Sequence, residues 1–181
     1  MFNFGQVVTF LTILLLGIQS ATSQPVTIQK ARELYFSIDK EPCNALTLTK
    51  LFDNDNPASP VLKAYFGAAS ASSPVCLDSP TKKISNFNKG KKLISESIAS
   101  KPNEYEIRFL RFATQTKAPG FLGYNDNVEE DKKFLISKAG EASKAINHKP
   151  TTTAILNFLI DSDELNQIEE KQLMTILSQL K

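Results

Sequence analysis

Residues 105–113 read Tyr-Glu-Ile-Arg-Phe-Leu-Arg-Phe-Ala, a run that leaves few polar positions on any face of a helix. A helix that is apolar nearly all round is expected to be central, with neighbours on two sides. Asn103, with Glu106 three residues later, predicts a capping box at its start. We therefore expect a fold in which other helices pack around this one.

Periodicity predicts helices almost throughout the rest of the chain. Ser59-Pro60 and Ser79-Pro80 each have the form of an N-cap followed by proline at the first helical position. Turn dipeptides do not recur at the spacing of β-hairpins. The predicted fold class is all-α, with about eight antiparallel helices in stacked pairs, and the helices are expected near residues 26–38, 42–52, 60–72, 80–101, 103–117, 127–147, 152–160 and 161–180.

The first residues form an apolar stretch of signal-peptide length, Val7 to Ile18, followed by small residues up to Ser23. This stretch is shorter than the roughly 20 apolar residues that a membrane-spanning helix needs. We therefore predict a cleavable signal peptide over residues 1–23 and one helical domain over residues 24–181. The protein is expected to be exported, to the periplasm or the extracellular space, and to keep no membrane anchor after cleavage.

The chain has two cysteines, Cys43 and Cys76. In an oxidising compartment they are either a disulfide or two buried, unpaired thiols. The predicted helices place Cys43 at the start of one helix and Cys76 just past the end of the next. Antiparallel helices joined by a short loop bring such ends together, and a bridge across this loop would contribute roughly 3.5–4 kcal/mol.

From Phe87 to Pro102 the spacing is aromatic, small, bulky, small and proline, carried by Phe87, Gly90, Ile94, Ser97 and Pro102. Small residues let a neighbouring helix approach closely, while the bulky ones fill the remaining space. The pattern resembles the second helix of a tetratricopeptide repeat, over about 25 residues. The whole chain also resembles small exported helical proteins of Bacteroidota that carry no assigned activity.

The resemblance implies a binding strip on the next helix. If Ile107 holds the leading bulky position of a repeat, the concave-face positions are Tyr105, Arg108, Phe112 and Gln115. Such a strip would suit a peptide segment or its carboxylate, because arginine offers two parallel hydrogen bonds. The alternative is structural: Arg108 and Arg111 would pair with Glu129, Glu130 or Asp131 at the start of the sixth helix.

Signals for catalysis are few. The single histidine, His148, is expected at the end of the sixth helix, where a cation meets the helix dipole favourably. Three acidic clusters lack the glycine and glutamate of a calcium-binding loop, and they are expected to cap helices. No phosphate-binding glycine loop occurs, and a net charge of +2 does not suggest a nucleic-acid surface. We expect no cofactor and no metal.

These observations predict a non-catalytic binding or scaffold protein that recognises a segment of another envelope or secreted protein. The alternatives are a carboxylate-dependent hydrolase of the envelope and a purely structural envelope component.

One connection between predicted helices is unusual, the loop Lys117 to Tyr124. Its apolar residues Phe121, Leu122 and Tyr124 are either a plug over the core, which we favour, or an exposed anchor for a partner.

Overall fold

A computed structural model describes residues 26–52, 57, 59–146 and 148–180. These residues contain eight α-helices, two short 3-10 helices and no strand, so the all-α prediction is confirmed. The predicted signal peptide lies outside the described residues. The elements are α1 (Ile28–Phe36), α2 (Asn44–Lys50), α3 (Pro60–Ser72), η1 (Ser73–Cys76), α4 (Pro80–Ser100), α5 (Tyr105–Lys117), η2 (Gly120–Leu122), α6 (Val128–Ala145), α7 (Lys149–Ile160) and α8 (Gln167–Ser178).

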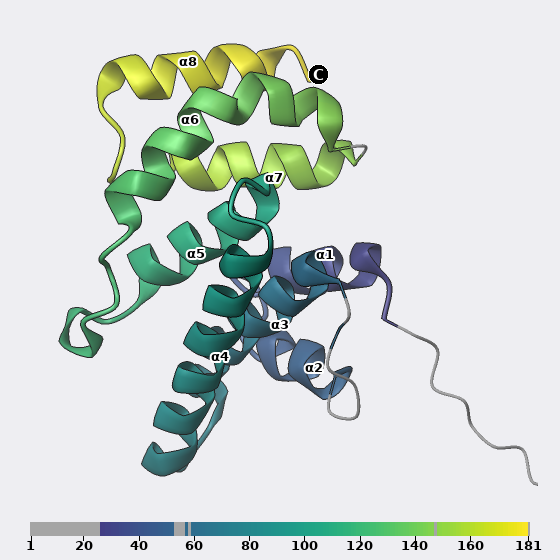
Figure 1. The fold of residues 1–181 in the computed structure, drawn as a ribbon, viewed down its shortest axis with the longest axis vertical. Coiled ribbons are helices and arrows are strands. Elements are labelled where there is room, and N and C mark those ends of the chain that lie inside the picture. Colours follow the sequence, from purple (N-terminus) through teal and green to yellow (C-terminus); the bar gives the residue numbers. More distant parts are fainter. Residues whose placement is uncertain (1–25, 53–56, 58, 147, 181) are drawn as a thin grey trace, which may run out of the picture.

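Helix α5 lies at the centre of the molecule. It packs on α3 and α4 on one side and on α6 on the other (Figure 1). Its side chains Ile107, Phe109, Leu110 and Phe112 are completely buried. The prediction of a central helix with neighbours on two sides is therefore confirmed. In Figure 1, α2, α3 and most of α4 lie below α5, α1 lies at about the same height as α5, and α6, α7 and α8 lie above it.

Helices α3 and α4 form the most extensive contact in the molecule, and two glycines make it possible. A Cβ atom at Gly90 would lie 2.5 Å from the backbone oxygen of Gly67 and 2.6 Å from the backbone nitrogen of Ala71. At Gly67 it would lie 2.9 Å from Cγ1 of Ile94. Ser97 is also buried on this face. Gly90 and Ser97, the small residues of the pattern from Phe87 to Pro102, thus allow the close approach of α3 and α4 that the pattern predicts.

Several helix ends match the sequence, and others do not. Helices α3 and α4 begin at Pro60 and Pro80, as expected. Helix α5 is preceded by Glu104 rather than by an Asn103 capping box. His148 does not end α6: it is the residue before α7, and its Nδ1 lies 2.6 Å from Oγ1 of Thr151.

The last helix also begins later than predicted. We expected it to start near Asp161, whereas Asp161 is the residue that follows α7. Helix α8 begins at Gln167, and the side chains of Asn166 and Glu169 form a complete capping box there. Two competing caps precede this helix in the sequence, and the second one is used.

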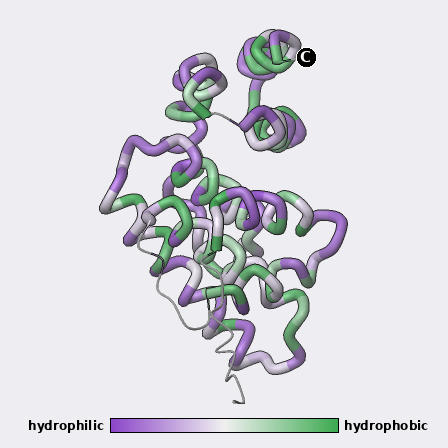
Figure 2. Tube along the Cα trace, turned by 90° about the vertical axis from the view of Figure 1, so that its right-hand side faces the viewer, coloured by the Kyte–Doolittle hydropathy of each residue, from purple (hydrophilic) through white to green (hydrophobic). Residues whose placement is uncertain are grey.

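Cys43 and Cys76 form a disulfide with a Cα–Cα distance of 5.6 Å. The bond joins the N-terminal end of α2 to the last residue of η1. Hydrophobic and hydrophilic residues alternate along the helices in short stretches (Figure 2). Among the described residues, none of the helices combines the length and the apolar character that crossing a bilayer demands.

Candidate functional site

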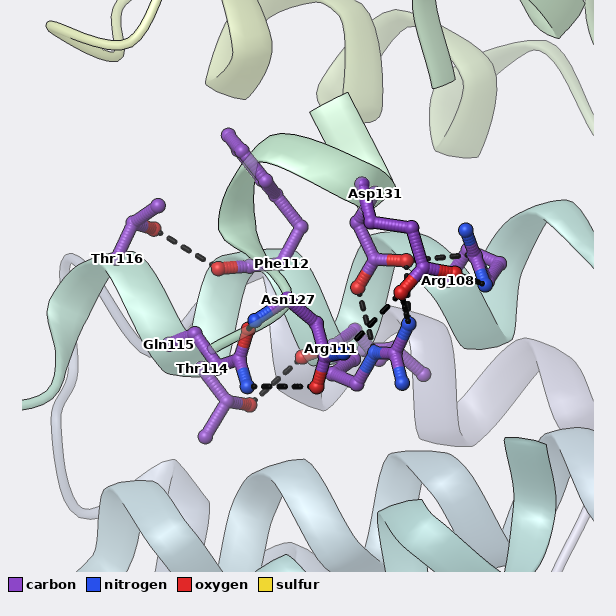
Figure 3. A network of polar contacts seen from close by, with 10 residues as sticks. Arg108, Arg111, Phe112, Thr114, Gln115, Thr116, Asn127 and Asp131 are labelled. Carbon is purple, nitrogen blue, oxygen red and sulfur yellow. Dashed lines mark hydrogen bonds and ion pairs between the residues drawn. The ribbon is translucent and has the colours of Figure 1, made fainter. Parts of the chain in front are cut away.

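The arginines of α5 point at the first turn of α6 (Figure 3). Arg111 donates from Nε and from one terminal nitrogen to the two carboxylate oxygens of Asp131, at 2.6 and 2.8 Å. Nε of Arg108 forms an ion pair with Asp131 at 2.5 Å, and its Nη1 donates to Glu130 at 2.7 Å. Asp131 is completely buried, so two arginines share one buried carboxylate.

Burial and ion pairing shift the pKa values of the carboxyl groups in this network in opposite directions. Burial raises the pKa of the Asp131 carboxyl, although Arg111 and Arg108 oppose that shift. Half-exposed Glu130 behaves differently, because its hydrogen bond from Arg108 holds the pKa of Glu130 below its ordinary value. Breaking one member of such a buried set leaves an unpaired charge, which is expensive. The network therefore fixes α6 against α5.

The residues of the predicted binding strip lie inside this packing. Arg108 is 8% exposed, and its guanidinium stacks 4.8 Å from the ring of Phe134. Tyr105 donates its hydroxyl to the carbonyl oxygen of Leu135, at 3.2 Å. The four positions are brought together on α5, but they face α6 and α7 rather than a surface.

Phe112 and Gln115 are likewise covered. Phe112 is fully buried and meets the ring of Phe158 edge to face. Gln115 is bonded at both ends of its amide to Asn127, the residue before α6. The structural alternative for the arginines therefore describes their contacts, with Glu130 and Asp131 as the partners. Glu129 pairs instead with Lys132 and Lys133.

A second buried ionic cluster has Glu106 at its centre. Arg32 of α1 donates Nε to Oε2 of Glu106 at 3.0 Å and forms a further contact with Oε1. Tyr65 of α3 donates its hydroxyl to Oε2 at 2.7 Å. These contacts tie α1 and α3 to α5. Glu106 was predicted as a capping residue, and no local pattern indicates partners 74 and 41 residues away.

One cavity among the described residues is an apolar groove of about 610 Å³. Seven elements or connections contribute to it: the ends of α1 and α3, η1, the start of α4, the end of α5, the η2 segment and α7. Three of its side chains are largely exposed: Val75 at 67%, Ile84 at 49% and Phe121 at 85%. The wall behind them consists of the aromatic rings of Phe36, Phe87 and Phe158. We call this cavity the apolar groove.

The loop between α5 and α6 has two separate roles. Tyr124 packs on Phe87, with ring centroids 5.8 Å apart, and Lys91 lies 4.8 Å from the Tyr124 ring. The end of the loop that carries Tyr124 therefore agrees with the predicted plug. Phe121 does not, because it is exposed at the edge of the apolar groove. Gly123 lies between the two, and its left-handed φ of 55° turns the chain back toward α4.

Comparison with protein-family models, with curated proteins and with solved structures returns no match. The apolar groove is the candidate site, because it combines a volume typical of ligand-binding sites with apolar side chains that no helix covers.

Proposed function

We propose that this protein is a non-catalytic binding module whose apolar groove receives apolar side chains from a segment of another exported protein. The observation that carries the proposal is the convergence of Val75, Ile84 and Phe121 on one cavity. They come from three separate elements, η1, α4 and η2. Exposed apolar side chains that gather at one place typically mark an interaction site.

The site of binding thus differs from the strip that the sequence suggests. Arg108 is only 8% exposed, and its guanidinium is already paired with Glu130 and Asp131 and lies against the Phe134 ring, so a carboxylate would have to displace these contacts. The apolar groove needs no such rearrangement. Its occupant would bury the rings and aliphatic chains that the fold leaves in solvent, which is the usual source of affinity in such a site.

Export of the protein and stacking of its helices in the manner of tetratricopeptide repeats are part of the same proposal. The Cys43–Cys76 disulfide supports export, since such bonds persist in oxidising compartments. The close crossing of α3 and α4 at Gly67 and Gly90 supports helix-hairpin stacking. A periplasmic or extracellular location fits both observations.

The carboxylate-dependent hydrolase is the weaker alternative. The two acids that are buried among the described residues, Glu106 and Asp131, are each held by arginines, and Asp131 does not line the cavity that Glu106 lines. A purely structural envelope component is favoured by the paired arginines but leaves the apolar groove without a role. The experiment below separates binding from this structural role.

The proposal is tested by photo-crosslinking. The photoreactive amino acid p-benzoylphenylalanine is placed at Phe121, at Ile84 and, as a control, at Ile168 on α8, which is 81% exposed and does not line the apolar groove. The oxidised mature protein is irradiated with the envelope and secreted fractions of its host. We expect one shared partner from the two groove positions and none of it from Ile168.

A groove variant then shows whether capture depends on the apolar wall. Val75→Asp places a charge in the groove at a position that is 67% exposed, so the fold should remain intact. Capture at Phe121 should be lost in this background, and circular dichroism should be unchanged. Equal capture at Phe121 and Ile168, or capture that persists in Val75→Asp, would refute the proposal and leave the structural role.

A further inference from the structure

The apolar groove does not end at its aromatic wall. A second cavity of about 420 Å³ shares four lining residues with it, Phe36, Asp39, Lys117 and Phe158. The far side of this second cavity is formed by the turn that follows α7. A segment lying in the apolar groove would therefore run directly into this cavity, which we call the acidic end.

The acidic end has a strong excess of negative charge. Four carboxylates line it, and one lysine, Lys117, is the only cation among its lining residues; the acids are Asp39, Asp161, Asp163 and Glu164. Among the described residues, none of the four forms an ion pair with a lysine or an arginine. Lys132 donates to the backbone carbonyl oxygen of Glu164 at 3.1 Å, and the side chains of all four acids are exposed. Their carboxylates are therefore accessible to a ligand.

Lys117 marks the boundary between the two cavities. Its ammonium lies 5.4 Å from the centre of the Phe158 ring, which is a cation–π contact on the shared wall. The site thus already contains one cation on an aromatic ring, in the lining of the same cavity as the four carboxylates. A guanidinium or ammonium from a partner would find the same two kinds of contact.

From this charge complementarity we infer that the segment bound by this protein is apolar at one end and basic at the other. Its apolar side chains occupy the apolar groove, and one or two lysine or arginine side chains occupy the acidic end. The inference rests on the proposed function and specifies the partner for that same site. Charges of this kind at the rim of an interface select the partner and fix its orientation.

The test uses three fluorescein-labelled synthetic peptides that share one apolar block of leucine and phenylalanine. The block is followed by arginines, by glutamates or by serines. Binding to the oxidised mature protein is measured by fluorescence anisotropy at low and at high salt. We expect the arginine peptide to bind about fivefold or more tightly than the serine peptide at low salt, since it forms two or more exposed ion pairs. That ratio should shrink at high salt.

Two variants of opposite charge provide matched controls. The triple variant Asp161→Asn, Asp163→Asn, Glu164→Gln should remove the preference for arginine and leave the serine peptide unaffected. Lys117→Gln keeps most of the aliphatic stem and should tighten the arginine peptide by about twofold, because a competing cation is lost. Urea denaturation of each variant shows whether the fold is intact.

The outcomes separate this inference from the proposed function. Equal affinity for the three peptides, or a preference for the glutamate peptide, overturns the charge assignment and leaves groove binding standing. No binding by any peptide also overturns the inference, while photo-crosslinking at Phe121 and Ile84 independently decides the proposed function. An arginine preference that survives in the triple variant overturns the acidic end as its cause.

Discussion

The crossing of α3 and α4 allows the same substitution to be tested at two glycines with opposite expected results. Gly90→Ala introduces a Cβ atom 2.5 and 2.6 Å from backbone atoms of α3, which cannot move without separating the helices. Gly140→Ala places the same atom in the middle of α6, where nothing lies within 4 Å. Both changes carry the same gain in helix propensity, about 0.8–1.0 kcal/mol.

The expected magnitudes follow from these contacts. Overpacking of a tight contact typically costs about 1–3 kcal/mol, and backbone atoms at 2.5 Å place Gly90 at the upper end. After the gain in propensity, Gly90→Ala should lower the free energy of unfolding by about 2 kcal/mol. Gly140→Ala should raise it by about 0.8 kcal/mol. In a chain of this size the two variants should move Tm in opposite directions, by about 2–4 °C per kcal/mol.

Urea unfolding followed by circular dichroism at 222 nm measures both changes, and the m-value reports whether unfolding remains comparable. The parental protein and both variants are compared under identical oxidising conditions. If Gly90→Ala were as stable as Gly140→Ala, the α3–α4 distance described above would be wrong. The helix packing built on that contact would then need revision.

Three further predictions concern the polar network, the disulfide and the tyrosines. Asp131→Ala leaves two buried arginines without their shared carboxylate and should cost about 3–5 kcal/mol in urea unfolding, whereas Glu141→Ala, which removes an exposed pair with Lys138, should cost less than about 1 kcal/mol. The variant in which Cys43 and Cys76 are both serine should lose roughly 3–4 kcal/mol in the same assay, because the unfolded chain is no longer constrained. A loss below about 1 kcal/mol would contradict that account. Burial raises the pKa of all four tyrosines, that of Tyr124 to about 12. The folded chain then holds more phenolic protons than the unfolded chain above pH 10, so the free energy of unfolding should fall as pH rises through 10, by up to about 1.4 kcal/mol per pH unit for each phenol. Absorbance at 295 nm should show tyrosinate appearing together with unfolding and not before it.

Features that depend on neighbours in the sequence could be predicted. Ser-Pro pairs placed the starts of α3 and α4, because proline lacks the N–H that the first turn cannot use. The spacing from Phe87 to Ser97 placed small residues on the face of α4 that meets α3. The apolar character of α5 indicated its central position. Each of these signals lies within one or two helical turns.

Helix ends with two competing signals could not be resolved in this way. Pro150 can follow one helix or open the next, and here it lies in the first turn of α7. Asp161 and Asn166 are both capping residues, and each is followed by glutamate three positions later. The side chain of Asn166 accepts hydrogen bonds from Ile168 and Glu169, so the second site begins α8. Packing against α6 and α7 decides between two locally similar choices.

The candidate site was beyond local prediction for a different reason. On a helix that is buried on both sides, a helical wheel does not tell which polar residue faces a partner helix and which faces solvent. The sequence therefore left both a structural pair and a binding strip open for Arg108, and the position of α6 beside it shows the structural pair. The apolar groove combines residues from seven parts of the chain, and no motif links Val75, Ile84 and Phe121.

The exposed side chains of the groove also limit the affinity with which it can bind a partner. Burying a large apolar side chain contributes about 1.5–3 kcal/mol, so covering Val75, Ile84 and Phe121 supplies roughly 3–6 kcal/mol, given that each is already partly covered. Association costs at least about 4 kcal/mol in lost translational and rotational freedom. These three residues alone therefore give almost no net affinity. A partner must also reach the aromatic wall of Phe36, Phe87 and Phe158, or pair its charges with the acidic end. The complex is accordingly expected to be transient, which is why covalent capture at Phe121 is a sharper test than co-purification.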